Sequence, residues 1–162
     1  MGAPKLLVVD DEPHVVSAVR RSLRGESYQV FGATRACDGL ALLAAHRVQV
    51  ILSDQHMPQH AGGEFLAQVM TLYPDTVRIV LSGHSPARAI RRAIDCGAIH
   101  DFITKPWDNE PLRVRLREAF RHYRDVIAPR LAAGHWRCAV GEGPVTFLSD
   151  HPGAAGTPEG SR

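Results

Sequence analysis

The strongest chemical signal in the sequence is the carboxylate of Asp54, which follows the apolar run Val48–Leu52 and Ser53. Four of the five residues in that run are apolar, which is typical of a buried strand. A carboxylate at the carboxyl end of such a strand is not needed for packing. In open α/β sheets this edge is where ligands bind. We therefore take Asp54 as the candidate reactive centre.

Three further apolar runs end in groups that suit such a centre. They are the acidic pair Asp10 and Asp11, the hydroxyl of Ser82 and the ammonium of Lys105. Parallel strands align their carboxyl ends on one edge of a sheet, so these side chains are expected to meet Asp54 in one pocket. Each has an ordinary explanation by itself, such as a helix cap, a turn or a solvated loop. Their occurrence together at strand ends indicates a site instead.

The chemistry that these groups favour is phosphoryl transfer. Three carboxylates placed close together repel one another unless a cation lies among them. Mg²⁺ suits such a site because it is a hard ion that prefers oxygen ligands and retains waters for an incoming phosphate. Lys105 adds a fixed positive charge and Ser82 adds a hydroxyl donor. The set predicts that Asp54 is the nucleophile, with Mg²⁺ and Lys105 stabilising charge on the transferred group.

The elements that must position these groups alternate along the chain. Short apolar runs predict five strands, at residues 6–9, 28–31, 48–52, 77–81 and 101–103. Apolar residues at helical spacing predict five helices that follow these strands, and Leu72 and Ile94 are among the side chains expected to face inward. Asp108 is expected to cap the last helix. This alternation predicts a doubly wound α/β fold with a parallel sheet.

The domain organisation follows from where the periodicity stops. We place one domain over residues 4–126 and a tail rich in Gly and Pro over residues 129–162. The tail is too short to bury a core of its own and is expected to be mostly irregular from Pro129 onward. Its one candidate strand is Val145–Leu148.

Composition bounds the function classes. A chain of 162 residues with a net charge of +2 gives no electrostatic argument for nucleic-acid binding. Its three cysteines form no CxxC pair, which is typical of a reducing compartment. We see no run long enough for a membrane helix and no signal peptide before the first strand, so a cytoplasmic protein is expected.

The sequence resembles the receiver domains of two-component response regulators. The motifs that carry the resemblance are Val8–Glu12, Ser53–Pro58, Leu81–Gly83 and Phe102–Pro106. The resemblance covers about residues 4–126. It implies a flavodoxin-like sheet with strand order 2-1-3-4-5 and helices on both faces. Trp107 and Asp108, which follow the last motif, are similar to receivers attached to cyclic-di-nucleotide phosphodiesterases or to hydrogenase-type transcription activators.

The resemblance also implies roles for individual residues. Asp54 would accept a phosphoryl group from a sensor histidine kinase. Asp11, Asp54 and the backbone carbonyl of His56 would bind Mg²⁺, with Asp10 acting through water. Ser82 would bond a phosphoryl oxygen after the switch, and Phe102 would be the aromatic residue that turns inward. The chain would then act as a signalling module, not as an enzyme.

A basic surface is the candidate for output. The last two of the five predicted helices, helix 4 before Gly97 and helix 5 after Asp108, carry the arginines at positions 88, 91, 92, 113, 115, 117, 121 and 124. One interpretation is that these arginines simply form a solvated face. The other is that they belong to the helix 4–strand 5–helix 5 surface, through which receivers usually control an output domain, an effector or a phosphorylation-dependent homodimer. No helix-turn-helix pattern follows helix 5, so direct nucleic-acid binding is not expected.

Two other functions are compatible with part of this pattern. A Mg²⁺-dependent phosphatase with an aspartyl-phosphate intermediate resembles this acid set, but such enzymes carry a DxD motif on the first strand, and here Asp10 and Asp11 are adjacent. Turnover of a generic phosphate ester would distinguish it. A receiver-like scaffold that is never phosphorylated is the other alternative. The complete acid cluster, Ser82 and Lys105 argue against it.

Overall fold

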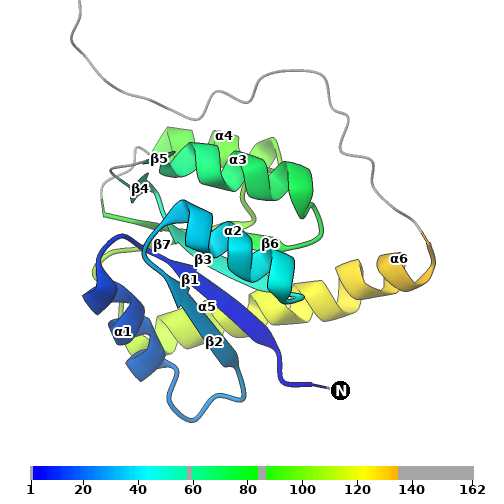
Figure 1. Cartoon of the computed structure of the whole chain (residues 1–162), viewed down its shortest axis with the longest axis horizontal. Helices are drawn as coiled ribbons and strands as arrows, with labels where there is room; N and C mark the ends of the chain where they lie inside the picture. Colours follow the sequence, from blue (N-terminus) through cyan, green and yellow to red (C-terminus); the bar gives the residue numbers. More distant parts are fainter. Residues whose placement is uncertain (1, 58–59, 84–86, 135–162) are drawn as a thin grey trace, which may run out of the picture.

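The chain folds around a parallel sheet of five strands. The computed structural model describes residues 2–57, 60–83 and 87–134. The strands are ordered β2-β1-β3-β6-β7 and all neighbours pair in parallel (Figure 1). Their bounds are β1 Lys5–Val9, β2 Gln29–Ala33, β3 Val50–Asp54, β6 Val77–Ser82 and β7 Asp101–Thr104. The expected order 2-1-3-4-5 is therefore confirmed, with β6 and β7 as the fourth and fifth strands.

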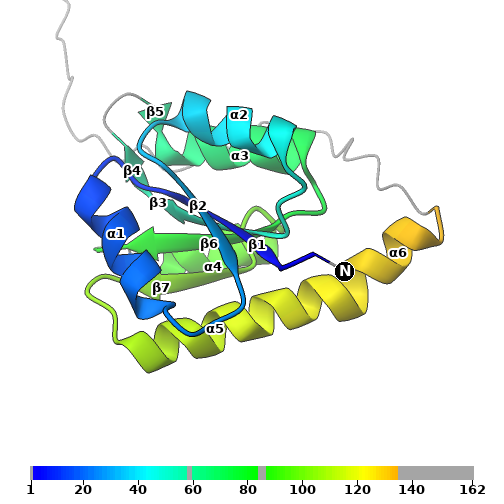
Figure 2. The same ribbon diagram turned by 60° about the horizontal axis from the view of Figure 1, so that its bottom comes forward.

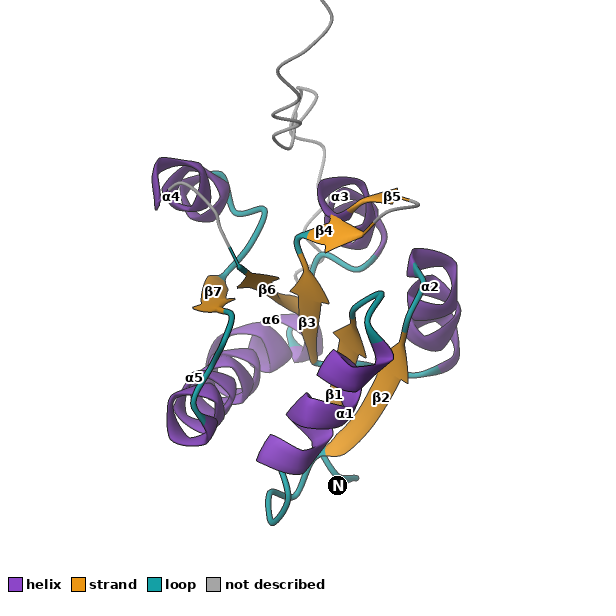
Figure 3. Cartoon of the chain, turned by 90° about the vertical axis from the view of Figure 1, so that its left-hand side faces the viewer, coloured by secondary structure: helices purple, strands orange, loops and turns teal. Residues whose placement is uncertain are grey.

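Helices cover both faces of this sheet (Figure 3). One face packs against α1 Pro13–Ser22 and α5 Asn109–His122, and the other packs against α2 Ala36–Ala45, α3 Gly62–Leu72 and α4 Ala87–Asp95. Each of the three central strands is buried on both sides because both faces of the sheet are covered, and most of its residues are apolar. Alternate residues of one strand therefore enter different cores: Leu6 and Val8 face α1 and α5, whereas Leu7 and Val9 face α2 and α3.

A short antiparallel hairpin links the central strand to α3. It consists of β4 His56–Met57 and β5 His60–Ala61. We did not expect it, because two-residue strands separated by Pro58 and Gln59 leave no apolar alternation to detect.

The last helix continues further than expected. A π-helical turn, η1 Tyr123–Ile127, joins α5 to α6 Ala128–Ala132, and Figure 2 shows the three as one long rod under the sheet. Pro129 is the second residue of α6, and the helix continues from the π-helical turn through it to Ala132, so the expected irregular structure does not begin there. Leu131 packs against the α1 and α5 core. The candidate strand Val145–Leu148 lies outside the described residues.

Three side-chain expectations are corrected by the structure. Leu72 is 62% exposed and Ile94 is 37% exposed, because each lies near the carboxyl end of its helix. Asp108 occupies the N-cap position of α5, but its side chain makes no capping hydrogen bond. No helix among the described residues is long and apolar enough to cross a membrane.

His100, just before β7, is a half-buried histidine whose role was not evident in the sequence. Its Nδ1 accepts a hydrogen bond from the backbone N–H of Arg78 at 3.0 Å, so this nitrogen carries no proton. Burial, together with the positive charges of Arg78 and His122, lowers the pKa of His100 to about 4. Protonation would also break the hydrogen bond to Arg78.

This arrangement predicts a pH dependence of stability. The unfolded chain takes up a proton on His100 near pH 6.5 and the native protein only near pH 4, so the contribution is complete above about pH 6.5 and is lost as the pH falls through about 4. Between these pH values we expect the free energy of unfolding of wild type to fall by on the order of 2 kcal/mol more than that of His100→Asn. Urea unfolding measures this difference. The exposed His14 gives the control: His14→Asn should follow wild type. Parallel pH profiles for His100→Asn and wild type would contradict the assignment.

Candidate functional site: an acidic pocket at the carboxyl edge of the sheet

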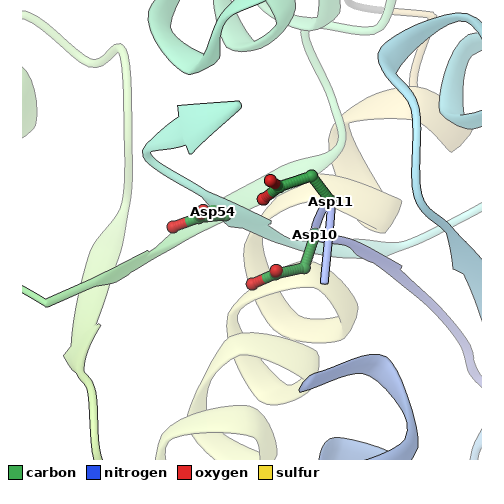
Figure 4. A group of neighbouring side chains, drawn as sticks. All are labelled: Asp10, Asp11 and Asp54. Carbon is green, nitrogen blue, oxygen red and sulfur yellow. The ribbon is translucent and has the colours of Figure 1, made fainter. Parts of the chain in front are cut away.

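The predicted acidic residues meet at the carboxyl edge of the sheet. Asp10 and Asp11 follow β1, and Asp54 is the last residue of β3, which pairs directly with β1. One carboxylate oxygen of each lies within 4.8 Å of the others, and Figure 4 shows the three side chains beside one another. Asp10 is fully buried and Asp54 is 7% exposed, whereas Asp11 is half-buried. The sequence-based expectation that these residues share one pocket is confirmed.

Lys105 supplies the positive charge of this pocket. Its Nζ lies 2.7 Å from Oδ2 of Asp10 and 3.2 Å from Oδ1 of Asp54. Burial alone would lower the pKa of Lys105, but the hydrogen bond to Asp10 and the charges of Asp54 and Asp10 outweigh it and raise that pKa. Lys105 is therefore a fixed ammonium at neutral pH.

Backbone contacts hold these side chains in place. Oδ1 of Asp10 accepts a hydrogen bond from the N–H of Glu12 at 3.0 Å. The N–H of Lys105 donates to the carbonyl of Ser82 at 2.8 Å, which joins the ends of β6 and β7. The peptide bond between Lys105 and Pro106 is cis.

Ser82 and Phe102 lie on the same side of the sheet. Ser82 is the last residue of β6 and is 2% exposed. Phe102 in β7 pairs with Val80 and packs, partly buried, against the core under α2, α3 and α4. Ser82 thus lies at the carboxyl edge of the sheet, level with the acidic pocket. Phe102 lies two residues further from that edge on its own strand. His56 is placed in β4, two residues after Asp54.

The donor set of the pocket fits a hard divalent cation. All three groups offer carboxylate oxygens, and the ion pairs seen among the described residues set one ammonium against three carboxylates, an excess of two negative charges. Oxygen donors with excess negative charge are what Mg²⁺ and similar ions prefer. The pocket can therefore bind a metal ion.

Comparisons with known proteins agree with this geometry. The profile of the response regulator receiver domain matches residues 6–117. The chain is 40% identical over 119 residues to the hydrogenase transcriptional regulatory protein HoxA of Bradyrhizobium diazoefficiens, covering 74% of this chain and 24% of that protein. It is 34% identical over 116 residues to the transcriptional regulatory protein KdpE of Mycobacterium tuberculosis, covering 72% of this chain and 50% of that protein.

A solved structure is similar over the same region. The signal receiver domain of an HD domain-containing protein from Pseudomonas fluorescens Pf-5 is 33% identical, with a TM-score of 0.70, covering 77% of this chain and 92% of that one. These matches, together with the acidic pocket and lysine at the carboxyl edge of a parallel sheet, identify a phosphoacceptor signalling module. The chain belongs to the response regulator receiver domain family. It spans a quarter to a half of the length of the HoxA and KdpE relatives.

Two residues of the structure were not singled out from the sequence. Arg78 is a charged residue inside the buried strand β6, and His100 pairs with its backbone. A charge flanked on both sides by apolar residues, as in Val77–Arg78–Ile79, was the signal that could have found Arg78.

The pairing of Lys105 predicts a stability effect. Lys105→Met leaves the buried carboxylate of Asp10 without its cation, so the free energy of unfolding should fall by about 3 kcal/mol in the presence of a chelator. Urea unfolding measures this change. Lys5→Met is the matched control, because no ion pair involves the Lys5 side chain among the described residues, and it should stay close to wild type. A loss below about 1 kcal/mol in Lys105→Met would show that the pair contributes little.

Proposed function

We propose that Asp54 is the phosphoacceptor of this receiver and that a sensor histidine kinase is the donor. A carboxylate oxygen of Asp54 attacks phosphorus, the P–N bond to the kinase histidine breaks, and the imidazole leaves. The observation that carries the proposal is the grouping of three carboxylates around one lysine at the strand ends of a receiver domain. Asp54 is the member of this group at the end of the central strand, and it remains slightly exposed.

The surrounding residues prepare Asp54 for this step. Lys105 contacts Asp54 directly, so its ammonium can also stabilise the negative charge on the phosphoryl oxygens. Asp10, Asp11, Asp54 and the backbone carbonyl of His56 would hold Mg²⁺, with Asp10 acting through water. The ion, when bound, offsets the negative charge of the carboxylates and the incoming phosphoryl group. The closeness of the three carboxylates supports this ligand set.

Phosphorylation is proposed to act on the α3 and α4 side of the sheet. The Ser82 hydroxyl would bond a phosphoryl oxygen, and Phe102 would turn inward behind it. Both residues lie on that side of the sheet, Ser82 at the carboxyl end of β6 and Phe102 two residues further back on the adjacent strand β7. Addition of a phosphoryl group to Asp54 would thus shift an equilibrium between two conformations of the α4–β7–α5 surface.

This surface is proposed to control an output partner, either an attached domain, a separate effector or a second copy of the chain. Arg88, Arg91 and Arg92 on α4 are exposed, and Arg115 on α5 pairs with Asp101 of β7 at 3.0 Å. An exposed basic surface beside the moving helix suits recognition by acidic groups. We propose that the chain itself does not bind nucleic acid and that it works in the cytoplasm, where kinases of this class deliver phosphoryl groups.

The first test is phosphoryl uptake. Wild type, Asp54→Asn and Asp38→Asn are incubated with Mg²⁺ and an acyl phosphate donor, and covalent label is measured after gel separation. Asp54→Asn should lose labelling completely, because an amide is no nucleophile. Asp38, an exposed acid on α2, is the control and should label as wild type does. Normal labelling of Asp54→Asn would refute the assignment.

A second test addresses the output surface. Beryllium fluoride with Mg²⁺ mimics the phosphoryl group, and sedimentation velocity then reports the association state. If the exposed arginines take part in association, Arg91→Glu with Arg92→Glu should weaken it by about tenfold, because reversed charges repel the acidic partner surface. Arg47→Glu, exposed beyond the end of α2, is the matched control. Equal affinity and association state in wild type and the double variant would exclude a role for these arginines.

A further inference from the structure

Arg78 is a buried cation that the proposed phosphoryl chemistry does not use. It lies in β6 and is 3% exposed. Side chains alternate along a strand, and Val77, Ile79 and Leu81 face the α1 and α5 core. Arg78 therefore points to the other face, with Val80 and Ser82, toward α3 and α4.

Its guanidinium donates to four backbone carbonyls in two separate loops. Nη1 donates to Pro74 at 3.2 Å and to Thr76 at 2.9 Å, both between α3 and β6. Nε donates to Ala98 at 2.8 Å and Nη2 to Gly97 at 2.9 Å, both between α4 and β7. The fork of one side chain thus bridges the segments that follow α3 and α4.

Carbonyl dipoles compensate the charge of Arg78. Among the described residues no carboxylate forms an ion pair with it. Burial lowers the pKa of Arg78 to about 10, and the charge of Asp75 acts in the opposite direction, so the guanidinium stays charged at neutral pH. A charged donor group that uses four of its five N–H groups on carbonyls is a strong structural link, and removing it leaves the buried carbonyls of Thr76 and Ala98 without this donor.

The link reaches the carboxyl end of α4. Gly97 and Ala98 lie directly after the last turn of the helix. There the N–H of Cys96 donates a hydrogen bond to the carbonyl of Arg92, and the N–H of Gly97 donates one to the carbonyl of Ile94. The carboxyl end of a helix carries partial negative charge, so a buried cation there is favourable. The amino end of α4, at Ala87, follows β6 and its terminal Ser82. The helix is thus attached to the proposed switch at one end and to Arg78 at the other.

We propose that Arg78 is a positioning residue that anchors the carboxyl end of α4, so that phosphorylation of Asp54 displaces chiefly the amino end of this helix. Only the second part of this inference, the displacement of the amino end of α4, rests on the proposed function. The anchor itself is a property of the unphosphorylated protein, and it is therefore tested first, without any phosphoryl group.

The first arm measures amide hydrogen exchange by NMR in the full chain. In Arg78→Met, the amides of Cys96, Gly97 and Ile99 should exchange at least about tenfold faster than in wild type, beyond any change in α1. Arg47→Met, an exposed arginine, is the control and should match wild type. Equal acceleration in α1 and at the end of α4 would show a uniform loss of stability and would overturn the anchor.

A second variant covers a failure of Arg78→Met to fold. Arg78→Lys keeps the charge, but one ammonium cannot donate to four carbonyls in two loops. The same local acceleration is expected in Arg78→Lys. Exchange as slow as in wild type at Cys96, Gly97 and Ile99 would overturn the proposal, because it would show that the bridging fork is unnecessary.

The second arm adds beryllium fluoride and Mg²⁺ and records amide shifts. In wild type, shifts should be large at Ser82 and the first turn of α4 and small at residues 96–99. In the Arg78 variant they should extend to residues 96–99. The same restricted pattern in both proteins would refute the effect on the switch. Failure of the proposed function is separate, since it would abolish all shifts in wild type and leave the exchange result intact.

Discussion

The structure depends on how the buried carboxylate of Asp10 is paired. A carboxylate removed from water costs several kcal/mol unless it is bonded and accompanied by a cation. Asp10 receives the N–H of Glu12 and, at 2.7 Å, the ammonium of Lys105. Because Lys105 also contacts Asp54, one ammonium fixes the ends of three strands, β1, β3 and β7, relative to one another. The geometry of the pocket is thus set by an ion cluster that extends across the sheet.

The negative charge of that cluster is only partly neutralised, and the rest of the fold must offset the repulsion that remains. The two negative charges left after Lys105 repel each other at one edge of the sheet. The strands that carry them are apolar on both faces and are covered by two separate cores, so burial of those strands offsets the repulsion. An excess of negative charge held rigidly in place is a site prepared for a cation, and a phosphoryl group adds to that need.

The site was accessible from the sequence because its members follow from strand periodicity alone. Asp10, Asp54 and Lys105 each end an apolar run, and parallel pairing then requires them to meet. Leu72 and Ile94 were placed wrongly because helical spacing gives the direction of a side chain but not where the neighbouring sheet ends. The continuation through α6 was missed because proline usually ends a helix, whereas here the helix continues from the π-helical turn through Pro129 to Ala132. The role of Arg78 was missed because its partners are backbone carbonyls, which leave no pattern of residue types.

The two faces of β6 differ in the kind of contact that they make with the two helical layers. Toward α1 and α5 the strand presents only Val77, Ile79 and Leu81, and a close-packed apolar interface resists small displacements. Toward α3 and α4 it presents a polar group at each end, Arg78 and Ser82, with Val80 between them. The hydroxyl at one end, on Ser82, is the group proposed to bond a phosphoryl oxygen, whereas the guanidinium at the other end, on Arg78, is held by four backbone carbonyls. On the proposed function, a signal that begins at Asp54 would therefore act first on the face of β6 that carries Ser82, and so on the layer that contains α4.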